Sequence, residues 1–486
     1  MKRILKGGLL TMLCLIGGIK ANAFIVLPDV ITDNMVLQQK EMNTLWGKGN
    51  AGKIINVTTS WDNKKYQGSI DAEGNWKLKF KTPSAGGPYT ILLSDGEDLT
   101  LKNVMIGEVW FCSGQSNMEM PLGGWGKIND YQNEIANANY PQIRLLKVKK
   151  AISSRPLSEF KSNTMGWQEC SPSTVADFSA TAYFFARNIY KTYPVAIGLI
   201  DATWGGTIVE SWTSRESIGK LPAFADTVKK IASIPADTKL TDPNKPTLLF
   251  NAMVNPFLQV SFKGILWYQG ESNNRRAYQY RELFPLLIKD WRERFNKPGM
   301  PFIYMQIAGY FPVEPQPTEG NWAELREAQA MALSLPNTGM ATAVDIGEAK
   351  DLHPKNKQEV GRRLALVALA KVYKQNVAYS GPVFRKMDVE GNKMTLTFSC
   401  TNGGLKTTDS EPMKGFAIAG EDKKFYWAKA QVRGNRIVVY APEVLKPVAV
   451  RYAWANNPVS NLTNGSGLPA LPFRTDNWPG LTFSAR

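Results

Sequence analysis

Two segments of this chain carry residue types that together can break an ester bond. Ser116 lies in a Gly-Gln-Ser-Asn-Met turn at residues 114–118, and the single histidine, His353, lies in Asp-Leu-His-Pro at residues 351–354. A serine hydroxyl is a weak nucleophile until a base accepts its proton, and histidine is the side chain that most often does so near neutral pH. If the chain is a serine hydrolase, His353 is therefore its base.

The histidine and cysteine content argues against a metal site. Most catalytic zinc sites use two or three imidazoles, which one histidine does not supply. Beyond the first 23 residues the cysteines are Cys112, Cys170 and Cys400, and their spacing matches neither a metal site nor a disulfide framework. We expect no metal, and cysteines in the core with at most one disulfide bond.

Residues 1–23 have the pattern of a signal peptide. Three cationic residues precede an apolar run at residues 9–16, which is too short to span a bilayer, and Ala-Asn-Ala at residues 21–23 offers small residues for cleavage. We predict an exported protein, periplasmic or secreted, whose mature chain begins near Phe24. No later stretch is apolar enough to cross a membrane, so no membrane association is expected after cleavage.

The composition, 43% hydrophobic and 21% charged over 486 residues, is that of a soluble globular protein with two or three domains. The formal net charge is +16, but it is spread along the chain in short pairs such as Lys149-Lys150. Because these pairs form no basic block with interleaved aromatic residues, nucleic acid is not an expected partner.

Two β-rich regions flank the middle of the chain. Residues 24–102 contain short β-type runs, for example at 54–59 and 76–80, separated by turns rich in Gly, Asp and Pro. This pattern predicts a small β-sandwich. Residues 376–486 return to β character and are expected to form a second β-rich domain.

The middle of the chain, residues 103–375, alternates apolar strands with helical segments. We expect strands at 104–111, 195–200, 262–268, 302–307 and 340–344, and helices at 181–192, 278–295, 322–332 and 357–373. Such alternation predicts an α/β domain with a mostly parallel sheet and helices on both faces. The ligand site of such a sheet lies at the carboxyl ends of its strands.

Two more blocks are expected at this edge: Thr-Trp-Gly-Gly-Thr at residues 203–207 and Tyr-Gln-Gly-Glu-Ser-Asn at 268–273. With the two segments described first, they resemble the SGNH hydrolase superfamily, specifically its sialate O-acetylesterase branch, a family of carbohydrate acetylesterases. The motifs match nearly verbatim, with Leu352 in place of isoleucine. The resemblance as a whole extends over the mature chain, including the flanking β regions. The resemblance implies a flavodoxin-like parallel sheet and an enzyme without metal or organic cofactor.

The resemblance also implies roles for individual residues. Ser116 matches the family nucleophile and His353 its general base, and Asp351 is the best candidate for orienting the imidazole. The wider superfamily spaces its last block Asp-x-x-His, whereas this chain has Asp-x-His. Asp345 is therefore a reserve candidate, and a dyad assisted by a backbone carbonyl is a further alternative.

The oxyanion hole is expected to use the backbone N–H of Gly205 and a side-chain amide from the block at residues 268–273. Gln269 and Asn273 both offer such an amide, and we favour Gln269 because it lies nearest the strand end. Glu271 is expected either to bind substrate or to form a structural ion pair. Arg275 is a candidate partner for the carboxylate of a sialic acid, and a solvated turn is the alternative.

Four tryptophans near the blocks are candidates for stacking on sugar rings, although core roles are expected for most of them: Trp125, Trp204, Trp212 and Trp267. The implied function is an exported esterase that removes O-acetyl groups, with the 9-O position favoured, from sialic acids. The alternative substrate is another acetylated glycan such as xylan. A non-catalytic carbohydrate-binding protein is the alternative of a different class, and a lipase or peptidase is a distant third, because the chain lacks a Gly-x-Ser-x-Gly elbow.

Overall fold

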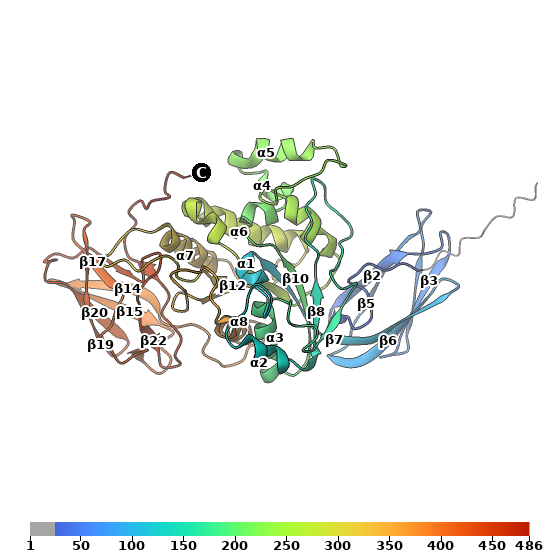
Figure 1. Ribbon diagram of the computed structural model, residues 1–486, viewed down its shortest axis with the longest axis horizontal. Helices are drawn as coiled ribbons and strands as arrows, with labels where there is room; N and C mark the ends of the chain where they lie inside the picture. The colour runs from blue at the N-terminus through green and yellow to red at the C-terminus, as the bar shows by residue number, and fades with distance from the viewer. Residues whose placement is uncertain (1–24, 486) are drawn as a thin grey trace, which may run out of the picture.

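The computed structural model describes residues 25–485, so the predicted signal peptide lies outside the described residues. Figure 1 shows three regions side by side: an N-terminal β region, a central α/β region and a C-terminal β region. The order of regions agrees with the pattern of the sequence. The central region carries the predicted site.

A parallel sheet forms the middle of the central region, in the order β13-β12-β11-β7-β10-β8, and β9 adds to the β8 edge in the antiparallel direction. The strands are β7 (Asp98–Gly114), β8 (Tyr140–Lys147), β9 (Gln168–Cys170), β10 (Ala196–Thr203), β11 (Gly264–Tyr268), β12 (Phe302–Gln306) and β13 (Thr338–Thr342). The five strands expected in this region all form. The strands β8 and β9 were not predicted.

Helices cover both faces of this sheet, as Figure 1 shows. Successive residues of a strand point to opposite faces, and in β7 the ring of Trp110 packs against Phe185 while that of Phe111 packs against Trp291. One face is therefore covered by α3 (Ala180–Thr192), which packs with α8 (Lys357–Lys371), and the other by α6 (Ala277–Arg294), which packs with α7 (Asn321–Met331). This arrangement confirms the predicted α/β fold.

The N-terminal region is joined to the central sheet by a continuous strand. The first half of β7 pairs with β6 in the antiparallel direction, and its second half lies between β10 and β11. The expected boundary at residue 102 therefore falls inside a strand. The other strands of this region are β1 (Val36–Gln38), β2 (Met42–Lys48), β3 (Ile54–Thr59), β4 (Lys65–Ser69), β5 (Asn75–Lys81) and β6 (Gly86–Ser94).

One apolar core runs through both of these regions. In β5 every second side chain is buried, namely Trp76, Leu78 and Phe80, and these pack in the same cluster as the core of the central sheet. The alternation is what a strand with one buried face requires. The N-terminal region is thus an extension of the central region in packing as well as in backbone.

The C-terminal β region has an apolar core of its own, built from side chains such as Ile418, Ile437 and Val450. Its sheets have the orders β14-β15-β20-β19, β18-β17-β21-β23 and β16-β22. The strands are β14 (Val383–Glu390), β15 (Lys393–Ser399), β16 (Leu405–Thr407), β17 (Phe416–Ala419), β18 (Phe425–Trp427), β19 (Lys429–Arg433), β20 (Arg436–Tyr440), β21 (Ala449–Tyr452), β22 (Leu462–Asn464) and β23 (Phe473–Arg474).

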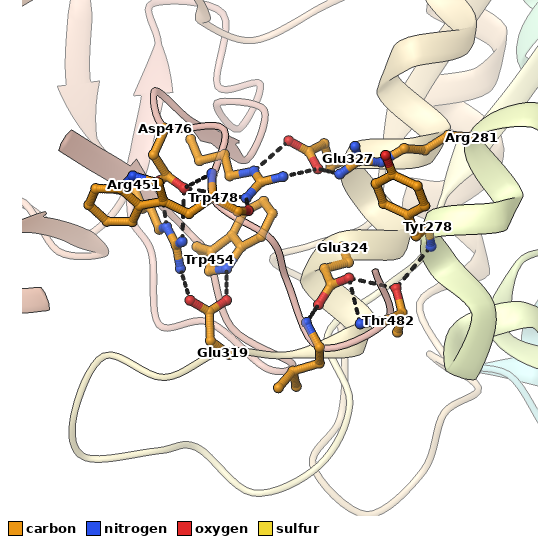
Figure 2. Close-up of polar contacts among 12 residues, drawn as sticks. Tyr278, Arg281, Glu319, Glu324, Glu327, Arg451, Trp454, Asp476, Trp478 and Thr482 are labelled. Carbon is orange, nitrogen blue, oxygen red and sulfur yellow. Dashed lines mark hydrogen bonds and ion pairs between the residues drawn. The ribbon is translucent and has the colours of Figure 1, made fainter. Parts of the chain in front are cut away.

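Polar contacts hold this C-terminal region against the central one, as Figure 2 shows. Arg451 bonds Glu319 and, at 2.8 Å, Asp476, while Arg474 bonds Glu327 of α7 at 2.8 Å. The carboxylate of Glu324 accepts hydrogen bonds from the chain end at Leu481 and Thr482. Charged pairs, rather than a shared apolar core, therefore make a large part of this junction.

Shorter elements complete the described chain: α1 (Ser116–Glu119), α2 (Tyr131–Ala136), α4 (Arg215–Ile218), α5 (Pro222–Ala232), η1 (Val209–Trp212), η2 (Phe250–Val254), η3 (Asn255–Phe257), η4 (Glu271–Arg276) and η5 (Ala332–Ser334). No helix within residues 25–485 combines the length and hydropathy needed to span a bilayer. Cys112 and Cys170 are buried, Cys400 is partly exposed, and all three are free thiols.

Candidate active site

The four sequence blocks meet at the carboxyl edge of the parallel sheet. Ser116 opens α1 directly after β7, the 203–207 block follows β10, and the 268–273 block follows β11. Gly114, with φ +138°, lies so close to β11 that a Cβ atom on it would be 2.1 Å from the carbonyl oxygen of Tyr268. Only glycine fits there, and this close approach brings the first and third blocks together.

Ser116, His353 and Asp351 form a chain of hydrogen bonds. His353 Nε2 lies 2.9 Å from Ser116 Oγ, and His353 Nδ1 lies 2.9 Å from Asp351 Oδ1. The same Asp351 oxygen accepts the backbone N–H of His353 at 2.9 Å. The short Asp-x-His spacing therefore does bring the carboxylate to the ring, because the loop folds back over its own backbone amide.

Asp345, the reserve candidate, is engaged elsewhere. Its two carboxylate oxygens accept hydrogen bonds from Arg363 of α8 at 2.6 and 2.8 Å. Such a paired arrangement satisfies both oxygens and fixes their direction. Asp345 thus anchors α8 and does not face the imidazole of His353.

The surroundings favour a neutral imidazole with its proton on Nδ1. Burial lowers the pKa of His353, and the nearby charge of Lys357 lowers it further, although the Asp351 carboxylate raises it. Burial alone would raise the pKa of Asp351, but the hydrogen bonds and charge of His353 outweigh it and the pKa is lowered. Because ionised Asp351 accepts from Nδ1, Nε2 is left as the acceptor for the Ser116 proton.

Gly205 lies against Ser116 from the β10 side. A Cβ atom on Gly205 would be 3.2 Å from the Cβ of Ser116. The Gly205 N–H donates to Glu119 Oε2 at 2.5 Å, and the other oxygen of Glu119 pairs with Lys150 at 2.6 Å. The backbone donor that the sequence predicted is therefore beside Ser116, with a carboxylate of the protein already bound to it.

Gln269 and Asn273 point into the protein interior. Gln269 Nε2 donates to the carbonyl oxygen of Thr207 at 3.1 Å and to Asn273 Oδ1 at 2.7 Å, and Asn273 Nδ2 donates to Glu210 at 2.9 Å. Both amides are buried and bind the segment that follows β10. The expectation that one of them faces Ser116 is corrected here: their bonds hold the Gly205 loop in place.

Glu271 belongs to a buried polar network behind Ser116. Asn117, the residue after Ser116, donates to Glu271 at 2.6 Å and to the carbonyl oxygen of Leu352 at 2.9 Å, and it accepts from Lys357 at 2.6 Å. Burial raises the pKa of Glu271 and lowers that of Lys357 to about 7. This network ties the Ser116, Glu271 and His353 segments together and supports the structural alternative for Glu271.

The sequence did not single out Asn117 and Lys357 as site residues. Asn117 stands in the quoted motif, so its position beside Ser116 was the available signal. Lys357 carries no local signal, because one lysine at the start of a helix resembles any other.

The structure places the predicted aromatic and cationic side chains at different depths. Trp125, 55% exposed, meets the His353 ring edge-on at a centroid distance of 5.4 Å. Trp204 is partly buried, whereas Trp212 and Trp267 are fully buried core residues. Arg275 is exposed and makes no ion pair with any residue in the range 25–485, while its neighbour Arg276 pairs with Glu210.

Comparison with known proteins agrees with this geometry. Residues 106–370 match the family described as carbohydrate esterase, sialic acid-specific acetylesterase. The chain is 30% identical to the sialate O-acetylesterase of Homo sapiens, with 93% of each chain covered, and 28% identical to that of Mus musculus, with 91% of this chain and 92% of the relative covered.

A solved structure extends the similarity to the whole fold. The crystal structure of a carbohydrate acetylesterase from Xanthomonas citri is 36% identical, with a TM-score of 0.85, and the match covers 94% of this chain and all of that one. The protein is accordingly an acetylesterase, a carboxylic ester hydrolase, and not a non-catalytic binding protein. The chain belongs to the sialic acid-specific acetylesterase family of carbohydrate esterases.

Proposed function

We propose that this protein removes O-acetyl groups from sialic acids, the 9-O-acetyl group among them, through an acyl-serine intermediate on Ser116. The observation that carries the proposal is the hydrogen-bonded chain from Ser116 Oγ through the His353 ring to Asp351. Each atom in it has the partner that ester hydrolysis by a serine requires.

The reaction follows from these contacts. His353 Nε2 accepts the hydroxyl proton as Ser116 Oγ attacks the acetyl carbonyl carbon, and Asp351 stabilises the imidazolium that forms. The imidazolium then protonates the departing sugar oxygen, which leaves acetyl-Ser116. A water molecule, deprotonated by the same imidazole, attacks this ester and releases acetate, restoring the serine.

The negative charge on the attacked carbonyl oxygen needs fixed donors. The backbone N–H groups of Ser116 and Gly205 are the proposed donors, since Gly205 packs directly on Ser116. Loss of one such donor typically costs about a hundredfold or more in kcat. For Gly205 to act, the carboxylate of Glu119 leaves its N–H, because two negative charges do not share one donor.

Two further parts of the proposal concern the substrate and the location. A sialic acid is favoured by cationic side chains at the same sheet edge, including Lys150, which pairs with Glu119, and the exposed Arg275. A neutral acetylated glycan such as xylan is the alternative. The signal-like pattern of residues 1–23 supports export to a periplasm or out of the cell.

The test is acetate release by the purified protein from a 9-O-acetylated sialic acid and from an acetylated xylan oligosaccharide, side by side. We expect faster release from the sialic acid and loss of release with Ser116→Ala, which removes the attacking oxygen. Faster release from the xylan would retain the mechanism and replace the substrate. Unchanged release with Ser116→Ala would remove Ser116 from the mechanism.

A further inference from the structure

A hollow of about 360 Å³ lies beside the nucleophile and is lined by three lysines. Lys147 ends β8, and Lys149 and Lys150 follow it directly. The remaining lining comes from Glu119, Val148, Asn163 and Thr203. Because Glu119 also binds the N–H of Gly205, the hollow adjoins the position where an acetyl group would meet Ser116.

The strand register gives the separation between this hollow and the nucleophile. Lys147 is level with Asp201 of β10, and Asp201 is level with Cys112 of β7. Ser116 follows β7 as Lys149 and Lys150 follow β8, so two strand spacings, about 10 Å, separate the two segments. A single acidic sugar spans such a distance, with its ester at Ser116 and its carboxylate at the lysines.

The positive charge of the hollow is compensated only in part. Lys147 Nζ donates to the backbone carbonyl of Asp177, and its charge faces the buried Asp201 beneath. Lys150 pairs with Glu119, the one carboxylate of the lining. Lys149 is exposed, and within residues 25–485 it makes no ion pair. The three ammonium groups thus meet two carboxylates, Glu119 in the lining and Asp201 beneath it, and the surplus positive charge at Lys149 favours an anionic ligand.

We propose that this hollow is a subsite for the carboxylate of an O-acetylated acidic sugar, with Lys149 and Lys150 as the groups that bind it. The inference rests on the proposed function, since it places the acetyl group of the same sugar at Ser116. Trp204 directly follows β10, the strand between β7 and β8, and the centroid of its ring lies 5.6 Å from Lys150 Nζ. It offers an apolar face to the sugar ring.

This assignment differs from the candidate that the sequence offered, Arg275. Arg275 follows β11, on the other side of β7, and none of the residues that line the hollow comes from its segment. The lysines have the advantage of a concave site, where a carboxylate loses more water and gains more from a nearby charge.

The experiment compares kcat/KM for 9-O-acetyl sialic acid with kcat/KM for its methyl ester, which has no negative charge. We expect the wild-type enzyme to prefer the acid. Lys149→Gln should lower kcat/KM for the acid about tenfold, as for a lost charge-assisted hydrogen bond, and change it less than about twofold for the ester. Lys150→Gln also releases Glu119, which changes turnover of both substrates alike, so its effect is measured as an acid-to-ester ratio of kcat/KM that falls about tenfold. Lys191→Gln, on an exposed turn of α3, is the matched control and should affect neither.

Other outcomes would overturn the subsite. Equal losses on acid and ester, or no loss, would show that the lysines do not bind the carboxylate, and a selective loss with Arg275→Gln alone would move the anion site to the other flank. Ser116-dependent release from the ester would keep the proposed chemistry in all these cases.

A second measurement does not depend on turnover. Calorimetry of the Ser116→Ala variant with the acetylated acid should show binding that Lys149→Gln and Lys150→Gln together weaken about a hundredfold relative to the methyl ester. Absence of acetate release from every substrate would contradict the proposed function, while this binding difference would still decide the subsite. Equal binding of acid and ester would contradict the subsite alone.

Discussion

The two flanks of Ser116 are prepared to different degrees. On the His353 flank, Ser116, the imidazole and Asp351 are already joined by hydrogen bonds of 2.9 Å. On the Gly205 flank, the N–H proposed to hold the reaction's negative charge is bound to Glu119. The His353 flank is therefore organised before substrate arrives, whereas on the Gly205 flank the oxygen of the attacked carbonyl has to replace the carboxylate of Glu119.

The contacts that hold the two flanks in place also differ. The His353 segment is tied to the interior through Asn117, which bonds the carbonyl oxygen of Leu352 and the buried Lys357. The partner of Gly205 is instead held by Lys150, an exposed lysine at the rim. Because the His353 side has the more rigid support, we expect substitutions there to change kcat more than substitutions of the Glu119–Lys150 pair.

Removing the base should give the largest effect. His353→Asn leaves Ser116 without a proton acceptor, so we expect kcat to fall by about 10⁴-fold or more with KM little changed, as for other serine hydrolases that lose this group. Acetate release measured under saturating substrate would show it. A fall of less than tenfold would mean that another group takes the proton and that the His353 flank does not carry out the proton transfer.

The choice between two aspartates comes next. Asp351→Asn should lower kcat by about 10²- to 10⁴-fold, because the imidazole loses its orienting partner and the charge that stabilises the imidazolium. Asp345→Asn is the matched comparison. Because Asp345 pairs with Arg363, this change should lower the unfolding temperature but have a smaller effect on kcat than Asp351→Asn. A larger kcat loss for Asp345→Asn would transfer the role to that residue.

These two aspartates also show what the sequence determined. The strand–helix alternation predicted the fold, and the four blocks located Ser116, Gly205 and His353, because motifs at strand ends are local features of the chain. The Asp-x-His spacing left Asp351 open, since a sequence does not specify that one carboxylate oxygen accepts from both the backbone and the ring.

Other features required the tertiary structure. The strand β8 was missed because Arg144 interrupts its apolar run, yet that arginine is buried and bonded to Asn34 and Asn103. The amide of Gln269 was favoured for the oxyanion because it lies at a strand end, but rotation of one side chain turns it into the interior. Packing decides such directions, and sequence position does not.

The buried network behind Ser116 should affect both stability and pH dependence. Lys357→Met would leave Glu271 with less compensation and remove the donor to Asn117, so we expect a loss of about 3 kcal/mol in the free energy of unfolding. The charge of Lys357 lowers the pKa of His353. Its removal should therefore raise that pKa and move the acid limb of kcat/KM against pH to higher pH.

In the wild-type protein the same groups determine how kcat/KM depends on pH. Activity requires neutral His353, whose pKa is held below its ordinary value chiefly by burial, so kcat/KM should fall only as pH drops below the usual range of histidine. Lys350→Met, an exposed lysine of the same loop, is the control and should leave the profile in place. An unmoved acid limb in Lys357→Met would show that this network does not set the charge of the imidazole.

The smallest expected effect concerns the Gly205 flank. Glu119→Gln keeps the length of the side chain but removes the negative charge next to Gly205, and a neutral amide oxygen is displaced more easily by the developing oxyanion. We expect kcat to rise, by up to about tenfold, which corresponds to about 1.4 kcal/mol in the barrier. Glu216→Gln, an exposed carboxylate of α4, should leave kcat unchanged.

The direction of this change separates two roles for Glu119. If its carboxylate only occupies the Gly205 N–H, the gain in kcat should appear for acidic and neutral substrates alike, because the oxyanion is common to both. A fall in kcat would mean instead that the charge of Glu119 is needed to orient the substrate or the Gly205 loop, and the Gly205 flank would then be as fully prepared as the His353 flank. The sign of one kcat ratio therefore decides whether the difference between the two flanks is functional.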